Sequence, residues 1–497
     1  MVPLVFDTRA LFRFIRLFSV IGGVISASFS TTAELCRQLE TTLGDFVVST
    51  VNDADYEALR TENWVQTAWG TPTCIFHPSA TEQLQKAVTL LVKGNVSFAV
   101  RSGGHEPHHG FANIDNGVLI DMSNFTRLDY DAGRSIATIG AGLRWGDVYT
   151  QLQTHGVIAV GGRVLDVGVP GLTLGGGLSW FTDLYGLACD NVVNMQVILA
   201  DGSIVNANTK ENKDLFWALK GGANNFGIVT KFTVTTYPLG QVWGGIKTYA
   251  TEQLPQLVDA YFEYQSAEHK DPYANLIMAV SPTNASIGAL VSMVYLKPEE
   301  EPAAFAPFYS INTTSDSTAI KSFTDYLAEY GVPSVPRFDW HATSFKLDKS
   351  LYEEVGNIIT SSPSVETIKA VTAGFMAITM QPISSGSVEI GRASNEGNAL
   401  GLEAVNQTWL ATATGWWFPN DDQTVHDAGD AIIDQFVAAS TSKGDHVPFL
   451  FMNDASWDQD VLVSYGEENY KRLKEVQMKY DPNLVFQRLV PGGFKLR

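Results

Sequence analysis

Basic side chains are scarce in this chain. It carries 33 lysines and arginines against 53 aspartates and glutamates, which leaves a formal net charge of −20. Binding to a nucleic-acid backbone or to anionic lipid requires a basic face. The charge therefore excludes nucleic acid and an anionic membrane surface as partners, and we interpret the acidity as a source of solubility.

Long hydrophobic runs are also missing, apart from one stretch near the N-terminus. Arg9, Arg13 and Arg16 precede an apolar stretch over residues 17–29, and small residues lie at its end between 26 and 30. The stretch is too short to span a membrane comfortably, and its layout is typical of a secretory signal. We expect residues 1–30 to be a signal peptide and the protein to be secreted, or to stay in the lumen of the secretory pathway, without a membrane anchor. The alternative is an uncleaved hydrophobic helix.

Cysteine is rare, with only three in 497 residues. In an oxidising compartment an odd number predicts one pair and one leftover thiol. Cys36 and Cys74 both lie early in the chain and outside its glycine-rich part, so we expect a disulfide between them. Cys189 has apolar neighbours, which favours a buried free thiol.

Spacings typical of a zinc site are absent, and we expect no metal. His108 and His109 are adjacent, but neighbouring side chains in an extended stretch point to opposite sides. We therefore interpret them as polar loop residues rather than as a pair of ligands.

Asn-x-Ser/Thr sequons agree with secretion, although each is a weak signal alone. The candidate glycosylation sites are Asn95, Asn124, Asn284, Asn312 and Asn406.

Helical and β-like patterns alternate between residues 74 and 239, which indicates an α/β or α+β lobe. The expected helices cover 81–93 and 145–155, and the expected strands cover 96–101, 118–121, 135–139, 193–199 and 204–207. Residues 240–455 have a different texture, with β-like runs at 288–295 and 371–380 and amphipathic helices at 254–267 and 320–330. We expect a second lobe there, followed by a helix over 466–476 before Pro482.

Glycines gather in three groups within the first lobe. The first is Arg101-Ser102-Gly103-Gly104-His105, which follows a predicted strand; the second spans residues 168–177, and the third spans 221–227. Glycines after a strand let successive N–H groups converge on one anion, for which a diphosphate is the natural ligand. Neither a Rossmann fingerprint nor a P-loop is present. A single group would be a plain turn, but three in one lobe favour a long cofactor that contains a polyphosphate.

Several of these motifs, taken in order, resemble the FAD-binding domain of the berberine-bridge-enzyme-like oxidases, in the vanillyl-alcohol-oxidase/PCMH superfamily, and the fungal secreted branch most of all. The resemblance rests on residues 101–105, 140–148, 161–177, 185–191, 214–229 and 480–486. It implies an α+β fold of two lobes. A PCMH-type FAD-binding domain over 68–239 is joined by residues 31–67 and by the C-terminal segment 456–497, and a substrate domain over 240–455 has an antiparallel sheet backed by helices.

The resemblance also implies how FAD is held. His105 occupies the position of the family's histidine that bonds to the 8α-methyl group of the flavin; the alternative is a histidine that merely packs beside it. Val164 stands about where some relatives have a second, cysteinyl link, so we expect a single covalent bond. Further contacts with FAD are expected from Arg101, Ser102, Gly103, Gly104, Gly142, Gly168, Gly175, Gly176, Gly177, Asn191, Gly227 and Val229.

The catalytic base departs from the family pattern. Relatives that oxidise carbohydrates use a tyrosine in an Asn-Tyr pair on a strand, and here Asn453 is followed by Asp454. Desolvation would raise the pKa of Asp454 and suit it to act as a base, whereas the alternative is a solvated acid at a strand end. Tyr465 either lines the site or packs in the core. Of Trp416 and Trp417, alternation along a strand puts only one on the side of the pocket, and Trp409 precedes them.

These residues predict an FAD-dependent oxidase that takes hydride from a small organic substrate and passes electrons to O₂, giving H₂O₂. The expected substrate is an alcohol, an amine or a polyketide-like intermediate of secondary metabolism. One alternative is a secreted carbohydrate or oligosaccharide oxidase. The other is a flavin-bearing protein that assists a cyclisation or a binding step without net oxidation. We expect a monomer whose partners are the substrate and O₂.

Overall fold

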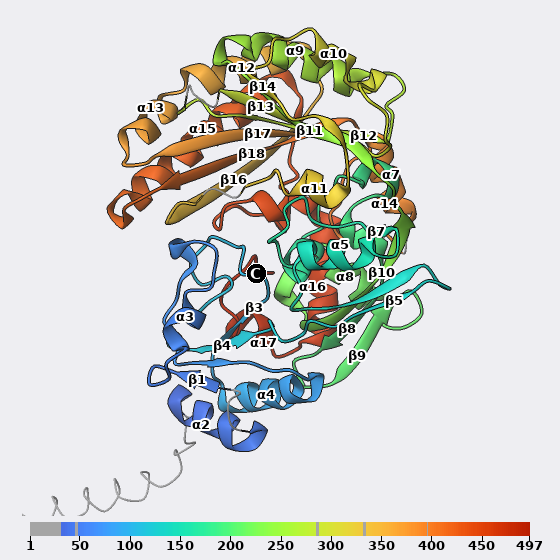
Figure 1. Ribbon diagram of the computed structural model, residues 1–497. Helices are drawn as coiled ribbons and strands as arrows, with labels where there is room; N and C mark the ends of the chain where they lie inside the picture. The colour runs from blue at the N-terminus through green and yellow to red at the C-terminus, as the bar shows by residue number, and fades with distance from the viewer. Residues whose placement is uncertain (1–30, 45–47, 285–287, 332–333, 395) are drawn as a thin grey trace, which may run out of the picture.

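The computed structural model describes residues 31–497, except 45–47, 285–287, 332–333 and 395. The predicted signal peptide therefore lies outside the described residues. Two lobes are stacked on each other (Figure 1): a large sheet covered by helices forms the upper lobe, and two smaller sheets form the lower one. The lower lobe holds residues up to β10 and the C-terminal helices, and the upper lobe begins at β11.

The first small sheet lies near the N-terminus, and its strands run in the order β1-β2-β4-β3. Strands β2, β4 and β3 are parallel, and all four residues of β4 are buried, as expected for a strand covered on both faces. The strands are β1 (Val48–Thr50), β2 (Cys74–Phe76), β3 (Phe98–Arg101) and β4 (Val118–Asp121), and helices α2 (Thr32–Leu43) and α4 (Thr81–Gly94) pack together on the sheet.

Helix α4 illustrates why this segment folds as the sequence predicts. Leu84, Ala87, Val88 and Leu91 recur at helical spacing and are buried against the sheet. The predicted disulfide between Cys36 and Cys74 is confirmed, and it joins α2 to β2 across 38 positions. Cys189 is confirmed as a buried free cysteine.

The second small sheet is antiparallel, with the order β5-β6-β10-β8-β9 and with β7 paired to β10. Its strands are β5 (Leu128–Asp131), β6 (Ile136–Gly140), β7 (Val157–Ala159), β8 (Val192–Ile198), β9 (Ile204–Asn208) and β10 (Ile228–Pro238). The helices around it are α5 (Trp145–Gln153), α6 (Val169–Leu174), α7 (Thr182–Tyr185) and α8 (Lys213–Leu219). Helix α3 (Tyr56–Arg60) contacts β2 and belongs to the first sheet.

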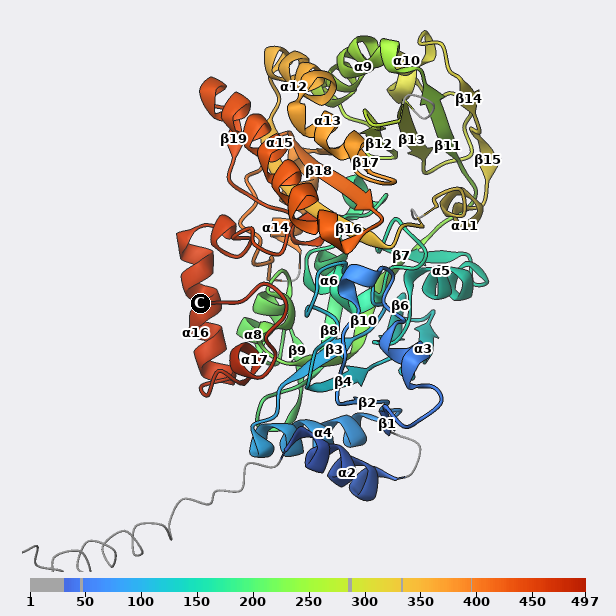
Figure 2. The same cartoon turned by 90° about the vertical axis from the view of Figure 1, so that its left-hand side faces the viewer.

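The upper lobe contains a nine-stranded antiparallel sheet with the order β14-β11-β13-β12-β17-β18-β16-β19 and with β15 paired to β11. Most of its helices cover the outer face, away from the lower lobe (Figures 1 and 2), but those over Phe323–Leu327 and Ser385–Ala393 lie against the lower lobe, where they contact α5 and α7. The strands are β11 (Val242–Tyr249), β12 (Ala274–Val280), β13 (Ala289–Tyr295), β14 (Ser315–Asp316), β15 (Ala319–Lys321), β16 (Arg337–Lys346), β17 (Phe375–Ile383), β18 (Gln407–Trp416) and β19 (His446–Val447). The helices are α9 (Leu254–Ser266), α10 (Ala306–Tyr309), α11 (Phe323–Leu327), α12 (Lys349–Ser361), α13 (Pro363–Ala370), α14 (Ser385–Ala393) and α15 (Asp422–Lys443).

Two elements of this lobe differ from the expectation. The helix predicted over 320–330 is shortened to α11, because residues 319–321 pair with β11 as an edge strand. The strand predicted from 371 begins only at Phe375, since Ala373 takes a left-handed backbone conformation with φ of 53°.

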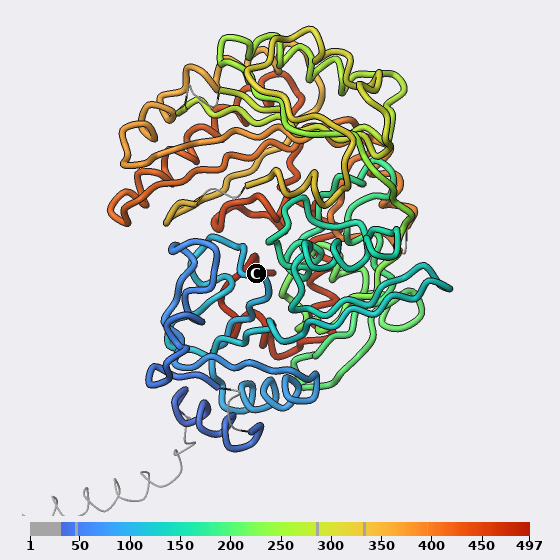
Figure 3. Tube along the Cα trace, in the orientation of Figure 1, coloured from blue at the N-terminus to red at the C-terminus, as the bar shows by residue number. Residues whose placement is uncertain are grey.

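The C-terminal segment returns to the lower lobe, where its trace runs beside N-terminal and central segments (Figure 3). It contains the short turns η7 (Met452–Asp454) and η8 (Val463–Tyr465) and the helices α16 (Glu467–Tyr480) and α17 (Val485–Arg488). Helix α16 packs on α8, and Phe486 contacts the ring of Phe98 edge-on. None of the helices in the described part of the chain is long and apolar enough to cross a membrane.

Candidate active site at the junction of the lobes

The first two glycine groups meet backbone to backbone. A Cβ on Gly103 would lie 2.4 Å from the nitrogen of Gly168, and one on Gly168 would lie 2.5 Å from the nitrogen of Gly103. The hydroxyl of Ser102 donates to the carbonyl of Ala141 at 2.6 Å, which ties the same loop to the end of β6. Loops from both small sheets thus converge, as a cradle for an extended cofactor requires.

Left-handed backbone explains the glycines at the end of the second group. Gly176 and Gly177 have φ angles of 109° and 81°, which only glycine adopts readily. At Gly142 and Gly227 the reason is close packing: a Cβ on Gly142 would lie 2.2 Å from the carbonyl oxygen of Met122, and one on Gly227 would lie 2.6 Å from Cγ1 of Val197.

Arg101 is occupied by the protein itself. Its guanidinium is buried and forms an ion pair with Asp121, a 3.0 Å ion pair with Glu62 and a 3.1 Å hydrogen bond to Asn63. Burial acts to raise the pKa of Asp121, but Arg101 and Ser123 outweigh it and lower the pKa. Arg101 therefore shapes the loop from within instead of presenting its charge to an anion.

Asn191 has a similar internal role. Its buried amide donates to the carbonyls of Tyr185 and Leu187, each at 2.9 Å, and accepts a 2.7 Å hydrogen bond from the hydroxyl of Tyr237. Val229 is buried on β10, where it pairs with Val197 of β8.

His105 lies where the lower lobe meets the upper one. Its ring stacks on Trp64 with centroids 4.5 Å apart, and Trp64 in turn contacts Phe338 of β16 at 4.7 Å. Burial and the charge of Arg144 lower the pKa of His105 to about 4, so the imidazole is neutral at neutral pH. Its buried Nε2 atom has no hydrogen-bond partner among the described residues.

These features fit a flavin cofactor. Gly103 and Gly104 place no side chain over the loop that follows β3, and His105 offers a neutral imidazole at the point where this loop meets the second lobe. A neutral ring nitrogen with a lone pair is what a covalent bond to a flavin methyl group requires.

Asn453 connects the C-terminal segment to the second glycine group. Its Oδ1 accepts from the N–H of Gly177 at 3.3 Å, and its Nδ2 donates to the carbonyl of Gly171 at 3.2 Å. A Cβ on Gly175 would lie 2.5 Å from Nδ2 of Asn453. The backbone of Asn453 forms the short turn η7, so our expectation of a strand at this position is wrong.

Asp454 follows in the same turn and is partly buried. Its Oδ2 accepts a 2.8 Å hydrogen bond from Nε2 of Gln381 on β17. Burial raises the pKa of Asp454 above its usual value, although the charge of Arg163 and the bond from Gln381 act to lower it. The alternative of a freely solvated acid does not describe this carboxyl group.

Arg163 is the cation whose charge acts on Asp454 and lowers its pKa. It makes no hydrogen bond or ion pair with the residues that the structure describes. Burial lowers the pKa of Arg163, and the charge of Asp454 counteracts that shift. Its charge is therefore available to a negative group or an electron-rich oxygen in this region.

Tyr465 packs in the core and does not line the site. It is buried, its hydroxyl donates to the carbonyl of Gly221 at 3.1 Å, and its ring stacks on Phe449 at 5.7 Å. Burial also raises the pKa of its phenol far above the ordinary value, which does not suit a base.

The tryptophans of β18 separate by face. Trp409 stacks on Phe451 at 4.6 Å and belongs to the core between the lobes. Trp416 faces the helices, where its Nε1 donates to Asp422 at 2.8 Å, and Trp417 lies past the strand end and is 49% exposed. Trp409 is therefore the aromatic residue directed toward the lower lobe.

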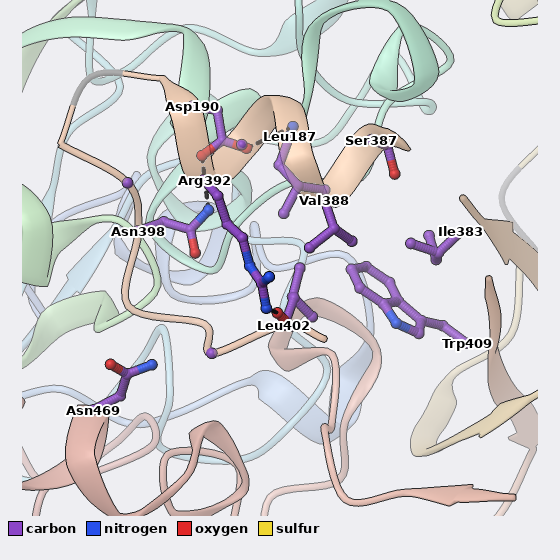
Figure 4. A pocket seen from close by; sticks show the side chains of 13 residues that line it. Leu187, Asp190, Ile383, Ser387, Val388, Arg392, Asn398, Leu402, Trp409 and Asn469 are labelled. Atoms are coloured by element: carbon purple, nitrogen blue, oxygen red, sulfur yellow. Dashed lines mark hydrogen bonds between the residues drawn. The ribbon is translucent and has the colours of Figure 1, made fainter. Parts of the chain in front are cut away.

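Trp409 also lines a pocket, which Figure 4 shows from close by. Trp409, Ile383 and Val388 form one part of its wall, and Arg392, Asn398 and Asp190 form another. Asp190 accepts from the N–H of Leu187 at 2.9 Å and from the amide of Asn398 at 2.8 Å. The wall includes none of the predicted cofactor residues and not Asp454, so this pocket does not coincide with the predicted site.

Sequence reasoning missed a group of histidines and carboxylates at the edge of β16. The ring of His108 is buried, with its Nε2 2.9 Å from Asp339 of β16, whereas His109 is exposed and lies 2.9 Å from Asp115. The two rings contact different carboxylates and share no partner. His108 lies in a loop, as we interpreted it, and it also joins the two lobes through its contact with Asp339. The pattern Asp339-x-His341 on a strand was the available signal.

The candidate sequons differ in exposure. Asn95, Asn124, Asn284 and Asn312 are exposed, whereas the amide of Asn406 accepts from the N–H of Ser385 at 2.9 Å and is partly buried.

Comparison with known proteins gives consistent matches. A family model described as an FAD binding domain matches residues 72–208. The chain is 39% identical to an FAD-dependent monooxygenase of Arthrobotrys oligospora, over 89% of this chain and 86% of that protein. It is 37% identical to a bifunctional solanapyrone synthase of Alternaria solani, over 86% and 82%. In fold it resembles glucooligosaccharide oxidase of Acremonium strictum, a structure titled for its 6-S-cysteinyl, 8α-N1-histidyl FAD, with a TM-score of 0.74 and 19% identity over 91% and 97% of the two chains.

Proposed function

This chain belongs to the FAD-linked oxidoreductases of the berberine-bridge-enzyme-like group in the vanillyl-alcohol-oxidase/PCMH superfamily, and on that premise we propose that it oxidises a small organic molecule of secondary metabolism with FAD bound covalently to His105. It is an FAD-dependent oxidoreductase with the two-lobed α+β fold of that superfamily. The main support for this proposal is that hydrogen bonds from Asn453 attach the turn bearing Asp454 directly to the glycine loop of the FAD-binding lobe.

When bound, the flavin accepts a hydride from a substrate C–H and passes the electrons to O₂, which yields H₂O₂. The chain's own residues supply the rest. Asp454 takes the proton from the neighbouring O–H or N–H of the substrate, and its burial supports this role because a raised pKa makes a carboxylate a better base.

Two neighbours tune that carboxyl group. Gln381 directs one hydrogen bond to Oδ2, which leaves Oδ1 free of a hydrogen bond to described residues. The charge of Arg163 keeps the pKa of Asp454 from rising further, and it favours a substrate oxygen that becomes more negative as its proton leaves.

His105 holds and tunes the cofactor rather than moving protons. With a pKa of about 4 it is neutral under working conditions, and Trp64 fixes the plane of its ring. A single link is favoured because Val164 carries no thiol. A covalent bond orients the flavin against the substrate, which is an entropic advantage.

A denaturing gel tests the covalent bond. Protein unfolded in acid and separated on the gel should show flavin fluorescence in its band, and His105→Ala should lose that fluorescence and release FAD to the supernatant. Fluorescence retained in His105→Ala, or absent from flavin-replete wild type, contradicts the link. Trp64→Phe is the matched control, since it keeps an aromatic neighbour and the reactive nitrogen.

A peroxide-release screen tests the reaction. Aromatic and aliphatic alcohols, amines and polyketide-like compounds should release H₂O₂, and mono- and oligosaccharides should not. Activity confined to oligosaccharides would favour the carbohydrate oxidase, which the loss of the family's tyrosine at position 454 counts against. Substrate conversion without O₂ uptake would favour a protein that assists cyclisation or binding. The name of one relative, a bifunctional solanapyrone synthase, is the reason to test for this outcome.

Secretion and glycosylation belong to the same proposal. The disulfide and the four exposed sequons support an oxidising compartment. Protein from a eukaryotic host should lose mass after treatment with an N-glycosidase, and Asn95→Gln should remove one part of that shift, whereas Asn406→Gln should not change it.

A further inference from the structure

Three buried or nearly buried side chains converge at the edge of β16. Asp339 and His341 alternate along the strand and so share one face, and His426 projects from α15 against them. One ligand atom from each lies within 4.8 Å of the others. Asp339 and His341 are 4% and 1% exposed, and the side chain of His426 is 12% exposed.

His341 is a second and independent observation. Its imidazole is fully buried, yet neither ring nitrogen has a hydrogen-bond partner within the described residues. Its Nε2 lies 3.3 Å from Oδ1 of Asp430 and 4.0 Å from Oδ2 of Asp339. A buried imidazole without hydrogen bonds is costly, and a metal ion is one means of satisfying it.

The helix is built to admit this ring. Gly429 lies in the interior of α15, and a Cβ there would be 2.3 Å from Cε1 and 2.6 Å from Nδ1 of His341. Any other residue would push the imidazole away from Asp430 and His426.

We propose that Asp339, His341 and His426 bind a Zn²⁺ ion that has a structural role separate from the flavin site, and that Asp430, whose Oδ1 lies 3.3 Å from Nε2 of His341, turns in as the fourth ligand. Two imidazoles and two carboxylates are a suitable ligand set for zinc. Tetrahedral bonds of about 2.0–2.2 Å place ligand atoms about 3.3 Å apart, which the 3.3 Å between His341 and Asp430 already meets. The 2.7 Å contact between Nδ1 of His426 and Asp339 must open slightly.

Neighbouring side chains contact the atoms of His426 and Asp339 that face away from the ion. Nε2 of His426 faces Oδ2 of Asp458 at 3.0 Å, and Oδ1 of Asp339 faces Nε2 of His108 at 2.9 Å. Such outer partners orient metal ligands. They come from the loop that follows Asp454 and from the loop that follows His105, so the ion would brace both lobes beside the active site.

Metal analysis of the flavin-bound holoenzyme tests the proposal. Protein with a Strep-tag, from zinc-supplemented medium, is dialysed against a weak chelator and assayed for zinc by mass spectrometry and for FAD by absorbance. We expect about one zinc per chain in the wild type and less than about a tenth of that in His341→Gln. Asp430→Asn should release zinc at a lower chelator concentration, and Asp427→Asn, on an exposed face of the same helix, should behave as the wild type.

Stripping the zinc with a strong chelator should lower the midpoint of thermal unfolding, and one equivalent of ZnSO₄ should restore it. Wild type that holds no zinc and takes up none from one equivalent overturns the proposal; the cluster is then a hydrogen-bonded charge network. Zinc content equal in wild type and His341→Gln also overturns it. If His341→Gln fails to fold, the comparison of Asp430→Asn with Asp427→Asn decides, and equal zinc release from the two contradicts the site.

Discussion

The carboxyl group of Asp454 is held between opposing influences. Burial raises its pKa, and Arg163 and Gln381 act to lower it. A group whose native pKa is raised binds its proton more tightly in the folded state, so stability is lost as pH rises from the unfolded value through the native pKa. The residue that makes the proposed base therefore weakens the fold at neutral pH.

Exchange of Asp454 for asparagine should separate these effects. We expect Asp454→Asn to lower kcat by about 10²–10⁴-fold, as loss of a general base does. The acid limb of the pH–rate profile, which burial of Asp454 moves to higher pH than for an ordinary aspartate, should vanish. The thermal midpoint at neutral pH should rise, because the amide has no charge to desolvate. An unaltered pH–rate profile removes Asp454 as the base.

Arg163→Met tests the role of Asp454 in a second way. Removing a charge that lowers the pKa of Asp454 should move the acid limb to higher pH while keeping the base. A limb that stays in place, or moves to lower pH, shows that Arg163 does not act on Asp454.

Two helix glycines allow a paired stability prediction. Gly→Ala in a helix interior normally stabilises by about 1 kcal/mol. Gly356→Ala in α12 should do so, since its Cβ would make an ordinary 3.4 Å contact with Val258. Gly429→Ala in α15 should instead lower the unfolding midpoint because of the clash with His341. Guanidinium melts of the two variants check this, and a gain of stability in both contradicts the geometry at His341.

At the scale of elements, the Cys36–Cys74 disulfide attaches α2 to the edge of the first sheet. It closes a loop of 38 positions, for which the chain-entropy relation gives about 4 kcal/mol. Cys36→Ser/Cys74→Ser should lose stability up to that amount in guanidinium melts, and α2 should become sensitive to proteases. Cys189→Ala is the control, because that thiol has no covalent partner. Equal loss in both variants would contradict a specific role for the bridge.

Helices and strands were predicted correctly where the segment carries one clear hydrophobic pattern. Helix α4 and strand β4 follow from helical spacing and from a continuous apolar run, and the structure places both within a residue of the expected bounds. Strand β15 was missed, because a three-residue edge strand depends on β11 as a partner and carries almost no pattern of its own. The turn at Asn453 was missed for a related reason: its shape is set by contacts with a loop that lies 276 positions away.

At the scale of the whole molecule, a buried amide is one of several hydrogen-bonding groups that fasten the end of the chain to the FAD-binding lobe. Asn225 donates to the carbonyl of Phe494 at 2.8 Å and accepts from the N–H of Leu496 at 3.2 Å. The ring of Phe494 then packs edge-on against Phe111, which follows the His105 loop.

Asn225→Ala should loosen the C-terminus, although Tyr470 and Lys474 still donate to the carbonyl of Arg497. Each buried partner left unsatisfied costs about 1–3 kcal/mol, so the variant should unfold at lower denaturant and be trimmed faster by carboxypeptidase. FAD fluorescence in the native state should rise as the lobe loosens. Asn208→Ala, at the second sheet's edge strand, is the control; unchanged trimming in Asn225→Ala would contradict the fastening role.

The sequence by itself determined the family, the FAD lobe, the disulfide and the departure at Asp454, because motifs and local patterns are carried by residues that are close together in the chain. Only the tertiary structure decided that Arg101 and Asn191 form internal bonds, that Tyr465 packs in the core, and that Asp454 is partly buried beside Gln381. It also brought His108, Asp339 and His426 together, although 231 positions separate the first two and 87 the last two. Burial and long-range contact are properties of the packed chain, and no local pattern encodes which polar groups end up facing one another.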